Sequence, residues 1–226
     1  MEEIEKKINN SFEDPLLLKE ALTHRSYLNE HADWPTDHNE RLEFLGDAVL
    51  ELVVTDRLFD KYPNFEEGKL TNIRAALVDH DMLSKVASEL ELERFIFLSK
   101  GEREGRKKAR EAILANTVEA LIGAVYKDKG YDRAKDFIQQ FILSNLEKIV
   151  NQELYKDPKS VLQEVVQEKK KVTPHYKVLE QEGPEHKKTF TVGVYFQEDF
   201  IAEGRGASKQ EAESDAAKKA LKKIRS

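Results

Sequence analysis

One segment near the start of the chain restricts the possible folds more than any other, because it is an apolar helix that carries three carboxylates on one face. Helical spacing is expected over residues 40–62. At 100° per residue, Glu43 and Asp47 lie about 60° and 20° from Glu40 around the helix axis. The other side chains of residues 38–50 are mostly apolar. A helix of this composition is typically buried.

Carboxylates on a buried helix repel one another and lose hydration unless a cation compensates their charge. Two explanations are open for these three: a divalent metal ion, or salt bridges to residues such as Arg41 and Arg74. A second apolar segment, residues 113–124, favours the metal, because its polar groups Asn116 and Glu119 are three residues apart and share a helix face. Oxygen ligands of this kind suit Mg²⁺ or Mn²⁺ better than zinc.

The remaining pattern up to residue 150 is also helical, and no segment has the alternation of a strand. A further carboxylate, Glu67, precedes Gly68 at an expected helix start, where it is either a part of the acidic site or a residue that stabilises the helix dipole. Gly130 is expected to end one helix. Besides residues 40–62, the expected helices cover residues 15–28, 69–90, 108–128 and 131–149, with a small helix or turn at 94–98.

The pattern changes after residue 157. Residues 151–157 are polar up to Pro158 and are expected to be a linker between a helical domain, residues 1–150, and a second domain, residues 158–226. In the second domain a helix (160–169) is followed by three short strands, one of which shows strict alternation over residues 190–196. A loop with two glycines (Gly204 and Gly206) and a Ser208–Glu211 capping box then lead into a last helix. The expected fold class is an all-α domain followed by a small α+β domain of order α-β-β-β-α.

Charge is divided unevenly between the two parts. From residue 155 to 226 the chain has 15 Lys and Arg against 12 Asp and Glu, whereas residues 1–154 are acidic. This division either indicates a cation-binding part joined to a polyanion-binding part or is ordinary scatter. The chain has no cysteine, which excludes disulfides, thiolate metal sites and a cysteine nucleophile. No apolar run is long enough for a membrane helix, and a soluble cytoplasmic protein is expected.

Residues 38–50 resemble the signature of bacterial ribonuclease III, and residues 113–124 resemble the second acidic helix of that family. The C-terminal part is similar to the double-stranded RNA-binding domain that follows the nuclease domain in those enzymes. The resemblance implies a Mg²⁺-dependent endoribonuclease, with Mn²⁺ as a substitute, in which Glu43, Asp47 and Glu119 carry the metal. Asp47 and Glu119 are implied to be the essential catalytic pair. Asn116 departs from the aspartate that is usual in the family, and it is expected to remain a metal ligand of weaker affinity.

The resemblance has further implications. Glu40 and Glu67 match the outer acidic residues, which position RNA or a second metal. The products are expected to be 5′-phosphate and 3′-hydroxyl ends, made by a homodimer in the processing of rRNA precursors and some mRNAs. Phe44 and Leu45 are then either dimer contacts or ordinary core residues. Two alternatives stay open: a catalytically weak scaffold that binds structured RNA, and a phosphohydrolase of small metabolites.

Three surfaces of the second domain are expected to contact the RNA duplex, because a reader of A-form RNA contacts 2′-hydroxyls and phosphates across its minor grooves. For each, the alternative is an ordinary solvated surface. The family usually has a basic cluster at the start of the last helix, whereas this chain has the single Lys209 beside Gln210 and Glu213. The second domain is therefore expected to bind RNA with modest affinity. The basic stretch Arg103–Arg110 is either a further phosphate contact or a flexible charged loop. The expected duplex contacts are Gln163, Glu164, Gln167, His186, Lys187, Ser208 and Lys209.

Overall fold

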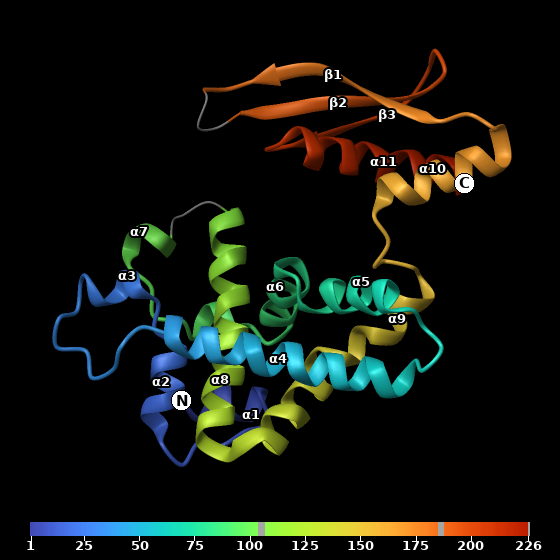
Figure 1. Ribbon diagram of the computed structural model, residues 1–226. Helices are drawn as coiled ribbons and strands as arrows, with labels where there is room; N and C mark the ends of the chain where they lie inside the picture. The colour runs from blue at the N-terminus through green and yellow to red at the C-terminus, as the bar shows by residue number, and fades with distance from the viewer. Residues whose placement is uncertain (104–106, 185–187, 226) are drawn as a thin grey trace. The chain divides into compact units, whose positions relative to one another are not determined.

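The structure is a computed structural model that describes residues 1–103, 107–184 and 188–225 (Figure 1). The chain divides into two compact units, Met1–Tyr155 and Lys156–Ser226. Among the described residues, no helix combines the length and the apolar character that crossing a membrane requires.

The first unit is helical, which confirms the predicted fold class for this part. Its two principal helices, α4 and α8, pack against each other more extensively than any other pair and form the centre of the core. The elements of this unit are α1 (Glu2–Lys7), α2 (Pro15–Ala21), α3 (Arg25–Leu28), α4 (Glu40–Lys61), α5 (Glu67–Val78), α6 (His80–Glu89), η1 (Leu92–Arg94), α7 (Lys100–Arg103), α8 (Lys107–Phe141), η2 (Leu143–Asn145) and α9 (Leu146–Asn151).

Three of the expected helices are interrupted, and the one predicted over residues 131–149 is divided into the end of α8, η2 and α9. The predicted helix 15–28 is interrupted because Thr23 forms a parallel bridge with Phe97, and the Phe97 amide donates to the Leu22 carbonyl at 2.8 Å. The predicted helix 69–90 is interrupted at Asp79, whose backbone is extended and whose side chain accepts from the Met82 amide at 2.8 Å as the N-cap of α6. The expected stop at Gly130 is present as a kink of positive φ within α8.

The second unit has the predicted α-β-β-β-α order. An antiparallel sheet of order β1-β2-β3 is covered on one face by both helices (Figure 1). The core between the layers includes Leu162 and Val166 from the first helix, Val194 from the sheet, and Ala216 from the last helix. The elements are α10 (Pro158–Lys170), β1 (Pro174–Glu182), β2 (Thr189–Phe196), β3 (Asp199–Gly206) and α11 (Lys209–Arg225).

The prediction of a glycine-bearing loop was wrong, since Gly204 and Gly206 both lie in β3. A Cβ on Gly204 would lie 2.1 Å from the amide nitrogen of Ala216, so the absent side chain lets α11 pack directly on the strand. The Ser208 hydroxyl accepts from the Glu211 amide at 3.1 Å, as the predicted capping box requires.

Candidate metal centre and RNA-binding surface

The candidate metal centre lies where α4 and α8 cross in backbone contact. A Cβ on Gly46 would lie 1.8 Å from the carbonyl oxygen of Glu119, and a Cβ on Gly123 would lie 2.1 Å from that of Leu42. Each glycine therefore faces the backbone of the opposite helix. Because both helices are at their closest here, polar side chains within one turn of the glycines are brought together.

Four of the predicted site residues meet at this crossing. The side chain of Asn116 hydrogen-bonds to the carboxylate of Glu43, and the charges of Asp47 and Glu43 both act on Glu119. Burial, followed by these two charges, raises the pKa of Glu119 from 4.5 to about 7. Burial also raises the pKa of Glu43, against the Asn116 hydrogen bond. The two helices therefore form one acidic cluster: Glu43, Asp47, Asn116 and Glu119.

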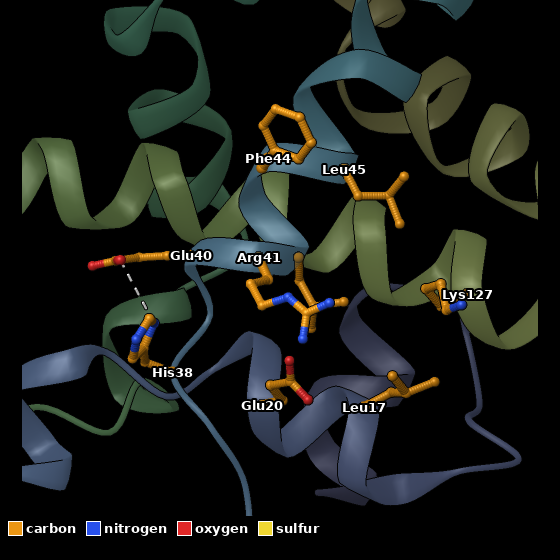
Figure 2. A pocket seen from close by; sticks show the side chains of 9 residues that line it. Leu17, Glu20, His38, Glu40, Arg41, Phe44, Leu45 and Lys127 are labelled. Atoms are coloured by element: carbon orange, nitrogen blue, oxygen red, sulfur yellow. Dashed lines mark ion pairs between the residues drawn. The ribbon is translucent and has the colours of Figure 1, made fainter.

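The salt-bridge explanation for this cluster is not supported. Arg74 pairs with Glu51 at 2.9 Å, away from the cluster. Arg41 extends toward Glu20 (Figure 2), a carboxyl on whose pKa its charge acts. Within the described ranges, no lysine, arginine or histidine forms an ion pair with Glu43, Asp47 or Glu119.

The chemistry of the cluster fits a divalent cation of the magnesium type. All of its donors are carboxylate or amide oxygens, and Glu119 is only 8% exposed while its charge lacks a cationic partner among the described residues. A buried carboxylate in this position is compensated by a hard cation. In the described part of the chain, no three His, Cys, Asp or Glu side chains converge into a group that could hold a metal ion, so the carboxylates of the cluster do not make a complete site. The oxygen of Asn116 and water molecules would complete the coordination.

The two outer acidic residues differ in their position. Glu40 lies at the edge of the cluster, where its charge acts on Glu43, and it faces Arg25 at 3.6 Å and His38 at 3.8 Å (Figure 2). Glu67 instead accepts a hydrogen bond from Thr71 and lines a separate cleft beside the second half of α4. Within one chain, the structure therefore brings Glu40 to the cluster but not Glu67.

Two neighbours of the site were missed from the sequence. His80, the first residue of α6, lowers the pKa of Glu43 by its charge. Asn39 is 3% exposed. Its backbone N–H donates to the Thr23 carbonyl at 2.9 Å and its side-chain amide donates to the Ala21 carbonyl at 3.4 Å. These two hydrogen bonds fix the start of α4. Neither residue follows a spacing that points to the cluster, because the contacts join separate elements.

An apolar stripe on α4 continues outward from the site. Phe44 is 81% exposed, which contradicts its interpretation as a core residue, whereas Leu45 is partly buried against the core. Leu52 and Phe59 are also exposed, and at 3.6 residues per turn they lie on the same side of the helix as Phe44. Phe44 and Leu45 line a cleft of about 620 Å³ (Figure 2).

The structure describes some of the residues that are predicted to contact the duplex in the second unit. Gln163, Glu164 and Gln167 are exposed on α10, while Ser208 caps α11 beside the exposed Lys209. His186 and Lys187 lie outside the described residues.

Charged side chains at the start of α11 and in the basic stretch of the first unit are partly engaged within the protein. Glu213, near the start of α11, pairs with Lys159 of α10, which reduces its repulsion of a phosphate. In the basic stretch of the first unit, Arg110 pairs with Glu93 at 2.9 Å and the Arg103 side chain reaches the Ile96 carbonyl.

Comparison with known proteins supports the same division of the chain. Residues 14–146 match the family model described as ribonuclease-III-like, and residues 158–224 match the double-stranded RNA binding motif. The chain is 44% identical to ribonuclease 3 of Nitratiruptor sp. over 98% of this chain and 96% of that one. It is 45% identical to ribonuclease 3 of Carboxydothermus hydrogenoformans over 98% and 94% of the two chains.

A solved structure agrees with the fold of the first unit. The nuclease domain of ribonuclease III from Campylobacter jejuni superposes with a TM-score of 0.58 at 40% identity, over 64% of this chain and 96% of that one. Both family models match the unit of the structure that has the corresponding fold, and the identity of 44–45% extends over nearly the whole chain. The chain therefore belongs to the ribonuclease III family.

Proposed function

We propose that the chain is an endoribonuclease that hydrolyses double-stranded RNA with Mg²⁺, or Mn²⁺ in its place, held by Glu43, Asp47, Asn116 and Glu119. The observation that supports this most strongly is the crossing of α4 and α8, which gathers these four side chains although about 70 residues separate the two pairs. Asp47 and Glu119 are the residues proposed to be essential for the reaction.

When bound, the metal ion supplies charge neutralisation at the phosphate and a lower pKa for a coordinated water molecule. The side chains of the cluster have distinct tasks around it. Asn116 is proposed to position Glu43, since its hydrogen bond acts to lower the pKa of that carboxyl. Asp47 is exposed, and it is proposed to orient the attacking water. Glu119, on α8, is buried and thus shielded from solvent.

The products proposed are 5′-phosphate and 3′-hydroxyl ends, with short 3′ overhangs made by two active sites of a homodimer, one for each strand. The exposed Phe44, next to the acidic cluster, supports a dimer, because large apolar side chains exposed in a row mark protein contacts. The similar Campylobacter jejuni structure is described with a region involved in dimer formation. In this dimer, Glu40 and Glu67 are proposed to position the RNA.

The second unit is proposed to hold the duplex through α10, the segment with His186 and Lys187, and the start of α11. The exposed side chains of α10 can address 2′-hydroxyls, and Ser208 and Lys209 lie at a helix N-terminus, where phosphate is favoured. We place the boundary between the catalytic and the RNA-binding parts at residues 151–157. The proposed substrates are rRNA precursors and some mRNAs.

One observation favours a second candidate, a catalytically weak scaffold that binds structured RNA. Asn116 replaces a possible carboxylate ligand and is engaged with Glu43, so the cluster has one negative charge fewer than an all-carboxylate set of four. The retained Glu43, Asp47 and Glu119 argue for catalysis instead.

Cleavage of a long RNA duplex separates the two candidates. The full chain is incubated with the duplex and with a single strand of the same sequence, with and without Mg²⁺, beside the Glu119→Ala variant. Cleavage of the duplex by the wild type alone, only with metal, supports the enzyme. Binding of the duplex without cleavage, in Mn²⁺ as well, would support the scaffold.

A further inference from the structure

The free edge of the sheet in the second unit borders a cleft away from the duplex contacts proposed above. β3 is an outermost strand of the order β1-β2-β3, and the cleft combines residues of this strand with residues of the second half of α11. Its volume is about 410 Å³, within the range of sites for small ligands. Two apolar residues, one carboxylate and three lysines line it: Phe200, Ala202, Glu203, Lys219, Lys222 and Lys223.

Phe200 gives this cleft an aromatic wall. The residue is 51% exposed, and its ring makes an edge contact with Tyr195, at 5.5 Å between ring centroids and 70° between planes. The ring lies beside Gly193, where an added Cβ would be 3.3 Å from a Phe200 ring carbon. An ordered and exposed ring of this kind is a surface on which a nucleic-acid base can stack.

The lysines give the same cleft a positive charge. Its described lining residues include three lysines and one carboxylate, and a second carboxylate, Asp215, pairs with Lys219 from outside the lining. Lys223 is held at the strand edge by a 2.7 Å hydrogen bond to the Ile201 carbonyl, and Lys219 is held by Asp215 at 2.9 Å. The cleft therefore combines an aromatic surface with cations fixed beside it, which favours a ligand that is both aromatic and anionic.

We propose that this cleft binds an unpaired nucleotide of single-stranded RNA, with the base against Phe200 and the phosphate near Lys219 and Lys223. The start of α11, which is proposed to contact the duplex, lies roughly 15–20 Å away along the helix, at 1.5 Å per residue. A duplex and a single-stranded extension can thus be held by different parts of one unit. The inference rests on the proposed function only in taking RNA as the ligand.

The test measures the affinity of the full chain, without metal to prevent cleavage, for three RNAs. These are a blunt duplex, the same duplex with five unpaired adenosines at one 3′ end, and the duplex with five abasic nucleotides there. The adenosine extension is expected to tighten binding about fivefold or more, as stacking of one base accounts for. The abasic extension is expected to have a smaller effect.

Three variants assign that gain to the cleft. Phe200→Ala should remove the advantage of the adenosines, Phe200→Trp should retain it, and Val178→Ala, which changes an exposed residue outside the cleft, should also retain it. Lys219→Ala should weaken binding of both extensions. Unchanged affinity of each variant for the blunt duplex shows that the unit remains folded.

The proposal is overturned if the adenosines give no advantage, if the abasic extension binds as tightly, or if Phe200→Ala keeps the full gain. Competition by an acidic, aromatic peptide as strong as that by single-stranded RNA would also overturn it, in favour of a protein partner. Cleavage of the blunt duplex in Mg²⁺ reports separately on the proposed function. Blunt cleavage without an advantage of the adenosines contradicts this inference alone.

Discussion

Gly46 and Glu119 are in backbone contact, and a single Cβ on Gly46 would lie 1.8 Å from the Glu119 carbonyl oxygen. Glu119 is also the most buried carboxylate of the acidic cluster. The close packing of α4 against α8 therefore also fixes the position of the Glu119 backbone. A change that separates α4 from α8 also changes the candidate metal centre.

The close contact predicts a large effect of Gly46→Ala. The added methyl group must push the helices apart, which should lower the free energy of unfolding by about 3 kcal/mol and abolish cleavage of duplex RNA. Urea unfolding, followed by the fluorescence of Trp34, measures the change in the first unit. Gly68→Ala is the matched control, since nothing lies within 4 Å of the added Cβ. Equal stability of both variants would show that the crossing is not this close.

The raised pKa of Glu119 predicts a pH-dependent effect of Glu119→Gln in the absence of metal. Because the folded state raises the pKa from 4.5 to about 7, the contribution of Glu119 is most favourable below pH 4.5 and is lost as the pH rises through 7. The variant should therefore be more stable than the wild type by about 1–2 kcal/mol at pH 8, with little difference near pH 4.

Thermal unfolding in EDTA at the two pH values checks this prediction, with the exposed Glu66→Gln as the control. Addition of Mg²⁺ at pH 8 should stabilise the wild type more than the variant, since the cation replaces the proton as the partner of the carboxylate. A destabilised variant at pH 8 would mean that Glu119 has a cationic partner without metal.

The hydrogen bond from Asn116 to Glu43 predicts the effect of Asn116→Asp. The substitution removes the donor and adds a negative charge to the cluster, so the Mg²⁺ concentration for half-maximal cleavage should fall several-fold. The metal-free protein should lose about 1 kcal/mol of stability through repulsion of like charges. Cleavage across a Mg²⁺ titration, with Asn116→Ala as the comparison, measures the first effect. An unchanged metal dependence would exclude residue 116 as a ligand.

The exposure of Phe44 predicts that the proposed homodimer depends on it. Phe44→Glu places a charge in the middle of the proposed contact, and sedimentation should show a monomer at concentrations where the wild type is a dimer. Leu16→Glu, at an apolar position exposed on α2, should leave the dimer intact. If Phe44→Glu sediments as the wild type does, the contact lies elsewhere.

The elements that sequence reasoning predicted well are those set by local rules. The helix of residues 40–62 follows from a continuous apolar pattern, and α4 spans Glu40–Lys61. The positions of Glu43 and Asp47 on one face follow from the helical repeat alone. By contrast, the break at Asp79 depends on a side chain that caps the next helix, and helical periodicity on both sides concealed it.

The parts of the site that could not be predicted depend on contacts between distant segments. The sequence contains Gly46 and Gly123, but only the crossing of α4 and α8 shows that each faces the backbone of the other helix. His80 acts on Glu43 from a different helix, and no spacing along the chain indicates this. Gly204 was expected in a loop because a glycine usually marks a turn, whereas here it makes room for α11.

Glu43, Asp47, Asn116 and Glu119 are proposed to hold one divalent cation together, and an anomalous diffraction measurement on crystals soaked in Mn²⁺ tests this most directly. A strong peak is predicted between α4 and α8, about 2.0–2.3 Å from oxygens of Asp47 and Glu119, with Glu43 and Asn116 bound directly or through water. Ordered density for the four side chains with no Mn²⁺ peak between them would contradict the claim.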